Sequence, residues 1–198
     1  MLELLAPAGN LDAVIAAVQN GADAVYMGFG DGFNARRSAD NFTRESFAKA
    51  VRYCHIRGCK VYVTLNTLVG DREMDAAAAL AQQASDAGAD AILVQDLGLA
   101  RVLRAALPDI PLHASTQMSI HNLAGVEAAA EMGITRAVLA RELSLEQIRF
   151  ISQHASIETE VFVHGALCFC YSGQCYMSAL IGRRSGTVSY THLTLPTT

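Results

Sequence analysis

The sequence predicts an α/β protein built as a TIM-like (β/α) barrel, and two observations support this fold class. Short apolar runs alternate with longer, alanine-rich amphipathic stretches along the chain, which is the pattern of βα units around a parallel sheet. A short block, Gly21-Ala22-Asp23-Ala24-Val25, recurs as Gly88-Ala89-Asp90-Ala91-Ile92 and more loosely from Gly133 onward. In each copy the glycine ends a helix and the following residues begin a strand, so the units repeat.

We expect seven strands, at residues 3–7, 24–28, 60–66, 91–96, 112–117, 136–141 and 160–164. The helices between them are expected at residues 11–20, 44–57, 72–87, 98–106, 123–132 and 145–154. Thr43 and Ser144 stand at helix N-cap positions, and Ser144 with Gln147 forms a capping box. A doubly wound Rossmann sheet is the alternative. No Gly-x-Gly-x-x-Gly motif follows the first strand, so the repeated units favour the barrel, incomplete at its C-terminus.

The composition describes one globular domain. The chain has 198 residues, of which 52% are hydrophobic and 17% charged. It lacks an apolar stretch of the roughly 18 residues that a membrane-spanning helix needs, and its first residues lack the basic segment of a signal peptide. We therefore expect a cytoplasmic protein with no membrane partner. The formal net charge of -4 gives no electrostatic footprint for DNA or RNA, so an RNA partner must be argued from other features.

Polar side chains follow the predicted strands, where a parallel barrel carries its active site. Because parallel strands all end at one rim, we expect these side chains to form a polar ring around the mouth of the barrel. Its members are Asn10, Tyr26, Gly28, Thr64, Asn66, Gln95, Asp96, His113, Ser115, Thr116, Gln117, Arg141, Glu142 and His164. Strand ends that merely face solvent are also polar, so the ring carries more weight than any one member. If Arg141 and Glu142 both stand on a strand, only one of them can face the barrel interior.

Three of the five cysteines lie close together, at Cys168, Cys170 and Cys175. An odd number of cysteines in a reducing compartment indicates metal ligands, catalytic groups or buried thiols rather than disulfides. Thiolates a few residues apart hold zinc or iron–sulfur clusters, although the separation of Cys168 and Cys175 is wider than that of a zinc knuckle. A catalytic Cys168 paired with His164, or buried structural thiols, are the alternatives that the spacing leaves open.

The segment around these cysteines resembles the signature of the collagenase-like peptidase family U32. That signature is a Glu-x-Phe-x-x-Gly-Ala-x-Cys run followed by Ser-Gly-x-Cys, and residues 160–168 and 172–175 carry it. The resemblance extends through most of residues 2–186, including residues 3–9, 63–67, 94–98 and 139–144. Residues 33–36, 113–117 and 172–176 look most like the subgroup that hydroxylates a cytidine of 23S ribosomal RNA. A sister subgroup acts on the wobble uridine of tRNA.

The resemblance implies an iron–sulfur-dependent RNA hydroxylase that modifies C5 of a pyrimidine in ribosomal RNA or tRNA and requires prephenate. It implies a four-iron four-sulfur cluster, with Cys168 and Cys175 as two of its four cysteine ligands. The alternatives are a peptidase, as the family name suggests, or a non-catalytic subunit that binds a protein partner in a hydroxylase assembly. The sequence has neither a His-Glu-x-x-His motif nor a Gly-x-Ser-x-Gly motif to support a peptidase.

For this hydroxylase we expect a binding site at the barrel mouth, which can receive a base that has left its stack. Amide and carboxylate groups would bond a base edge or substrate hydroxyls, and an arginine would bond a carboxylate or phosphate. The expected catalytic residues are Asp96, Gln117, Arg141 and His164, and the expected substrate-binding residues are Asn66 and His113.

The remaining cysteines and the end of the chain are interpreted separately. Cys170 has no counterpart in the family pattern, and we expect it, like Cys54 and Cys59, to be a buried structural thiol. Residues 1–186 are expected to form a barrel domain that is truncated before the other two cluster ligands. The Thr-rich residues 187–198 leave the family pattern and are interpreted as a non-native tail.

Overall fold

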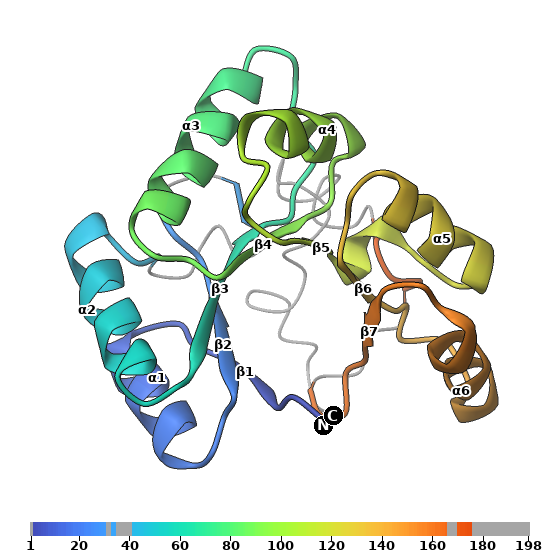
Figure 1. Ribbon diagram of the computed structural model, residues 1–198, viewed down its shortest axis with the longest axis horizontal. Helices are drawn as coiled ribbons and strands as arrows, with labels where there is room; N and C mark the ends of the chain where they lie inside the picture. The colour runs from blue at the N-terminus through green and yellow to red at the C-terminus, as the bar shows by residue number, and fades with distance from the viewer. Residues whose placement is uncertain (1, 31–32, 35–40, 166–169, 176–198) are drawn as a thin grey trace, which may run out of the picture.

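The computed structural model describes residues 2–30, 33–34, 41–165 and 170–175, which form a curled parallel sheet with helices on its outer face (Figure 1). Neighbouring strands pair in chain order, and every pair is parallel. The strands are β1 (Leu5–Pro7), β2 (Ala24–Met27), β3 (Lys60–Leu65), β4 (Ala91–Val94), β5 (Leu112–Ala114), β6 (Arg136–Val138) and β7 (Glu158–Glu160). The predicted α/β, TIM-like class is confirmed.

Helices connect the strands, and two of them begin at the predicted caps Thr43 and Ser144. They are α1 (Leu11–Gln19), α2 (Arg44–His55), α3 (Met74–Asp86), α4 (Leu97–Ala106), α5 (Leu123–Glu131) and α6 (Leu145–His154), with a 3-10 turn η1 (Thr116–Met118) after β5. The side chains of Thr43 and Ser144 accept backbone N–H groups at the starts of α2 and α6, and Ser144 with Gln147 forms the expected capping box. Within the described ranges, every helix is too short or too polar to cross a membrane.

Three strands end well before the predicted residue, whereas the others end within two residues of it. The strand expected at 112–117 stops at Ala114, because the hydroxyl of Ser115 accepts the N–H of Gln117 and turns the chain into η1. The strand expected at 136–141 stops at Val138. The strand expected at 160–164 was wrong: β7 is Glu158–Glu160, and the apolar side chains that suggested a later strand include Val163, which is 86% exposed.

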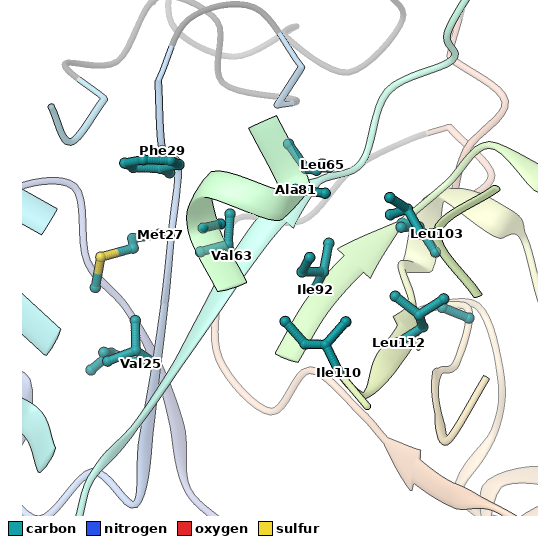
Figure 2. Packing of buried hydrophobic residues seen from close by; sticks show 14 of the residues in the cluster. Val25, Met27, Phe29, Val63, Leu65, Ala81, Ile92, Leu103, Ile110 and Leu112 are labelled. Atoms are coloured by element: carbon teal, nitrogen blue, oxygen red, sulfur yellow. The ribbon is translucent and has the colours of Figure 1, made fainter. Parts of the chain in front are cut away.

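The main hydrophobic core lies between the sheet and the surrounding helices. Alternate strand residues face outward, so that Val25 and Met27 of β2, Val63 of β3 and Ile92 of β4 pack in one layer with helix side chains such as Leu103 (Figure 2). Burying an aliphatic side chain of this kind stabilises a fold by about 1.5 to 3 kcal/mol. The helices are therefore held on the outside of the barrel by the same residues that form its strands.

A smaller cluster fills the inside of the barrel. Ala24, Ala91, Leu93 and Val138 are buried there around Tyr62 of β3, which is 2% exposed. The small side chains of Ala24 on β2 and Ala91 on β4 leave space for the aromatic ring of Tyr62, since a packed interior has few voids. The interior is thus filled by side chains and leaves the strand ends to form a site.

A polar network closes the interior at the end where the strands begin. Arg136, the first residue of β6, lies between Glu3, which precedes β1, and Glu158 of β7, at N–O distances of 2.5 and 2.6 Å. Tyr62 and Lys60 of β3 also donate to Glu3, at 2.8 and 3.1 Å. Partial burial raises the pKa of Glu3, but hydrogen bonds from Arg136, Tyr62 and Lys60 outweigh this effect and lower it to about 2. The network joins β3, β6 and β7 to the segment before β1.

Replacing Arg136 by methionine should destabilise the fold, because three carboxylates, those of Glu3, Glu158 and Glu160, then lose their shared cation. We expect the free energy of unfolding, measured by urea titration at pH 7, to fall by about 3 to 5 kcal/mol. Arg149→Met, an exposed change on α6, is the control and should alter it by less than about 0.5 kcal/mol. Adding Glu3→Gln to Arg136→Met should recover part of the loss. Equal losses with and without Glu3→Gln would contradict this account.

Candidate functional site at the barrel rim

The polar residues that follow the strands lie on one rim, because all strands run in the same direction. Asn66, which follows β3, donates to the hydroxyl of Ser115 after β5, at 3.3 Å. Gln95, which follows β4, donates to the carbonyl oxygen of Gln117 at 3.5 Å. The predicted site residues Asn66 and Gln117 are therefore brought into one hydrogen-bonded group, and both are half-buried.

Asp96 caps helix α4 from the rim. Its Oδ1 accepts the N–H of Leu99 at 2.8 Å, and its Oδ2 accepts the N–H of Val69 at 3.3 Å. A carboxylate at a helix N-terminus satisfies unpaired N–H groups and interacts favourably with the helix dipole. The structure thus uses Asp96 to join the loop after β3 to the start of α4, while its catalytic role stays a prediction.

His113 lies inside the barrel on β5 rather than on the rim. It is 4% exposed, and its ring meets the ring of Tyr62 edge to face with centroids 4.9 Å apart. Burial, together with the charge of Arg136, lowers the pKa of His113 to about 3. Its Nδ1 has no hydrogen-bond partner among the described residues. The ring is therefore neutral at pH 7, and its substrate-binding role stays a prediction.

The turn at residues 170–175, part of the cysteine-bearing segment, rests against the rim. Ser172 is fully buried, and its hydroxyl accepts from both the backbone N–H and the Nε of Arg141 at 3.2 Å. Ser119 donates its hydroxyl to the carbonyl oxygen of Ser172. At Gly173, a methyl group would lie 2.2 Å from the carbonyl oxygen of Gln117, so only glycine fits this approach. The Ser-Gly pair of the motif is therefore the part that docks.

Glu142 holds the same turn from the other side. Its Oε1 accepts the N–H of Ser172, and its Oε2 lies 3.5 Å from Nε2 of His121. Partial burial raises the pKa of Glu142, but hydrogen bonds from backbone N–H groups and from Ser172 outweigh this and hold it below its usual value. Arg141 and Glu142 both contact Ser172, and the condition of the expectation, that both stand on a strand, is not met. They follow the end of β6, where strand alternation no longer applies.

Sequence reasoning missed Ser119 and His121, which belong to the loop between β5 and α5. Nδ1 of His121 lies 2.6 Å from the carbonyl oxygen of Ser119, and because a carbonyl only accepts, Nδ1 carries the proton. Polar residues recur from Ser115 to Asn122, interrupted only by Met118 and Ile120, and this recurrence was the signal that could have identified them. His164 is exposed and follows the end of β7 at Glu160, and the described contacts do not join it to the other predicted site residues.

The cysteines fall into two groups at opposite ends of the barrel. Cys175 and Cys170 are half-buried on the rim turn, so the prediction of a buried thiol was wrong for Cys170, and Cys168 lies outside the described residues. Cys54 and Cys59 are buried near the start of β3, as expected for structural thiols. Burial raises the pKa of Cys54 to about 12. Within the described part of the chain, no three His, Cys, Asp or Glu side chains are grouped to hold a metal ion; residues 187–198 also lie outside that part.

Comparison with known proteins identifies the family. The sequence matches peptidase family U32 over residues 9–189, and the chain belongs to that family. The 23S rRNA 5-hydroxycytidine C2501 synthase of Escherichia coli is 45% identical over 177 residues, which cover 89% of this chain and 26% of that protein. The tRNA hydroxylation protein P1 of Bacillus subtilis is 42% identical over 176 residues, covering 89% and 42%. A collagenase of Porphyromonas gingivalis is 35% identical over 188 residues, covering 89% and 44%.

Solved structures agree with the fold. The U32 peptidase Mk0906 superimposes with a TM-score of 0.69 at 18% identity, covering 85% of this chain and 71% of that one. A glycerophosphodiester phosphodiesterase from Galdieria sulphuraria gives a TM-score of 0.60 at 10% identity, covering 81% and 84%. The chain spans between 26% and 46% of the length of the curated relatives described as RNA-modifying or proteolytic proteins.

Variants of Asp96 should separate its capping role from catalysis. Asp96→Ala removes the acceptor for Leu99 and Val69 and should lower the free energy of unfolding by about 1 to 2 kcal/mol, measured by urea titration. Asp96→Asn keeps an acceptor oxygen for Leu99 and should lose less than half as much. If Asp96→Ala is as stable as the unchanged chain, the capping role is contradicted. If Asp96 is also catalytic, Asp96→Asn should lose activity while keeping most of its stability.

His113 should make the fold sensitive to acid. Its folded-state pKa of about 3 lies below the ordinary value of 6.5, so the unfolded chain takes up the proton first as the pH falls. Stability is therefore present above about pH 6.5 and is lost progressively toward pH 3, by ~1.4 kcal/mol per pH unit. His113→Phe should remove this contribution in urea titrations between pH 7 and 5. His154→Gln, an exposed control on α6, should keep it, and identical pH slopes for all three proteins would refute the assignment.

Proposed function

We propose that this chain is part of an RNA hydroxylase that modifies C5 of a pyrimidine, with 23S ribosomal RNA favoured over tRNA as its substrate. The observation that carries the proposal is the 45% identity, across 89% of the chain, to the 23S rRNA 5-hydroxycytidine synthase. Relatives named for tRNA hydroxylation match over a similar share of the chain at lower identity. Both kinds of RNA are present in the cytoplasm, where the protein would act.

The rim offers the groups that such a substrate needs. Asn66 and Gln117 are half-buried; Asn66 joins the hydrogen-bonded group through its side-chain amide and Gln117 through its backbone. Each side-chain amide can both donate to and accept from a base edge. Arg141 is exposed, and its planar guanidinium suits a phosphate or the carboxylates of prephenate, which we propose as a co-substrate. In this proposal Asp96 acts mainly by fixing α4 at the rim, and His164 approaches from the segment after β7.

The thiol groups on the rim turn are of the chemical type that binds iron–sulfur clusters. Cys175 and Cys170 bring half-buried sulfur to the rim, and thiolates are the ligands of such clusters. We propose Cys168 and Cys175 as two of four ligands of a four-iron four-sulfur cluster, with the other two in the portion of the relatives that this chain does not span. When bound, a cluster would supply one-electron transfer. The rim residues would bind and orient the base beside it.

A peptidase is the second candidate, because the family name and the Porphyromonas gingivalis collagenase point to it. A thiol protease needs a cysteine and a histidine within hydrogen-bond reach. His164 is exposed, and Cys168 lies outside the described residues, so the described contacts contain no such pair to favour it. A non-catalytic role in an assembly with a protein partner remains the third hypothesis.

The decisive experiment uses this chain joined to the C-terminal part of the Escherichia coli 23S rRNA 5-hydroxycytidine synthase and purified without oxygen. Expressed in an Escherichia coli strain that lacks its own 23S rRNA synthase, it should restore hydroxycytidine to ribosomal RNA, as read by nucleoside mass spectrometry. Cys168→Ala and Cys175→Ala should abolish the mark and the visible absorbance of the cluster, whereas Cys170→Ala should keep both. A folded, colourless protein that cleaves collagen peptides and leaves RNA unchanged would instead establish the peptidase.

A further inference from the structure

The turn that carries Cys175 is held by a closed ring of contacts. Ser119 donates its hydroxyl to the carbonyl oxygen of Ser172, and Ser172 donates its N–H to Glu142. Oε2 of Glu142 lies 3.5 Å from Nε2 of His121, which pairs with the carboxylate when the imidazole is protonated, and His121 donates from Nδ1 back to the carbonyl oxygen of Ser119. These four residues come from the loop after β5, the loop after β6 and the cysteine turn. The ring therefore ties three segments that are far apart in sequence.

The backbone at Ser119 is unusual in a way that the ring explains. Its φ is 59°, in the left-handed region, and among the described residues it is the one non-glycine with a positive φ. Residues other than glycine rarely adopt this conformation, and they keep it where surrounding contacts over-determine it. At Ser119 this conformation accompanies a hydroxyl that bonds Ser172 and a carbonyl that bonds His121. The strain is thus located at the contact between the rim and the cysteine turn.

Further contacts fix the turn next to the ring. Gln174 donates from Nε2 to the hydroxyl of Ser119 at 3.2 Å, and Gly173 packs directly on the carbonyl oxygen of Gln117. Ser172 is fully buried although it lies in a loop. A loop is normally exposed and mobile, because buried loop backbone has few hydrogen-bond partners. Here each polar group of Ser172 has a partner on the barrel.

We propose that Ser119 and Glu142 are positioning residues that hold residues 170–175 on the rim and thereby fix Cys175 beside the substrate groups. The purpose of this positioning rests on the proposed function, whereas the positioning itself is a property of the protein without a cofactor. The hydrogen bond to Glu142 involves a charged acceptor, so it contributes more than a neutral hydrogen bond does. Its loss should open the turn locally while the barrel stays folded.

The test compares Glu142→Ala with Glu146→Ala, an exposed glutamate in the first turn of α6, in this chain without a cofactor. Iodoacetamide labelling of each cysteine is followed by mass spectrometry. We expect Cys175 in Glu142→Ala to react about tenfold faster than in the unchanged chain, because one charge-assisted bond is lost. Glu146→Ala should react at the unchanged rate. Glu142→Gln keeps an acceptor oxygen and should fall between them.

Ser119 is tested by two substitutions that separate its hydroxyl from its backbone strain. Ser119→Ala and Ser119→Gly both remove the hydroxyl, but glycine also relieves the strain at positive φ. Both should speed the labelling of Cys175, and both should speed hydrogen exchange of the Ser172 amide. If Ser119→Gly labels at the rate of the unchanged chain, the hydroxyl does not hold the turn and its positioning role is overturned.

Labelling of the two buried cysteines and hydrogen exchange of the Ser172 amide serve as internal controls. Cys54 and Cys59 are buried in the barrel, so they stay unlabelled if a variant opens only the turn and become labelled if it unfolds. Rapid exchange of the Ser172 amide in the unchanged chain, or unchanged Cys175 labelling in Glu142→Gln and Glu142→Ala, overturns the proposal.

Iron content of the joined protein then tests what the turn is positioned for. Loss of iron in Glu142→Ala, with partial retention in Glu142→Gln, supports positioning of a cluster ligand. Normal iron content with a loosened turn overturns that purpose. A joined protein that never binds iron refutes the cofactor of the proposed function, while the labelling rates still decide whether Ser119 and Glu142 hold the turn.

Discussion

The curled shape of the sheet depends on the contact of Arg136 with Glu3 and Glu158. Among the described residues, β1 pairs only with β2 and β7 only with β6, so no backbone ladder joins the two ends of the sheet. The guanidinium of Arg136 joins the two ends of the sheet instead, by binding Glu3 and Glu158, and the hydroxyl of Tyr62 donates a further hydrogen bond to Glu3. A buried ion pair contributes little net stability when it is complete, but it strongly disfavours arrangements that separate its members. The pair of Arg136 and Glu3 therefore favours the curvature that brings the segment before β1 next to β6.

This division of the interior explains how the rim becomes available for function. The charged network around Arg136 closes the barrel at the end where the strands begin. Tyr62 and smaller apolar residues fill the middle of the barrel, and the main core lies between the strands and the helices. Polar groups at the strand ends are then not needed for packing and bond to one another or to loops. Asp96 and Ser115 still serve structure there, because each accepts backbone N–H groups that shape the rim. The rim therefore carries residues that stabilise the fold beside residues that are available for binding or catalysis.

The cysteine turn depends on this shaped rim. The left-handed Ser119, the glycine-only approach at Gly173 and the buried Ser172 are departures from ordinary loop behaviour, and all three occur at one contact. Natural sequences usually violate local rules where a site requires it. Their coincidence beside Cys175 marks this contact as the part of the rim where geometry is most constrained.

The sequence by itself determined the βα order, the helix caps at Thr43 and Ser144, and the gathering of Asn66 and Gln117 at one rim. Hydrophobic periodicity, capping chemistry and parallel direction are local or repetitive signals, and each can be read from a few neighbouring residues. Only the tertiary structure decided that β7 begins at Glu158, that His113 faces inward, and that Ser119 and Glu142 bond to Ser172. These outcomes depend on pairs such as Arg136 with Glu158 and Glu142 with Ser172, which are 22 and 30 residues apart. A local sequence pattern cannot predict contacts between residues so far apart in the chain, because these contacts form only where the folded barrel brings its loops together.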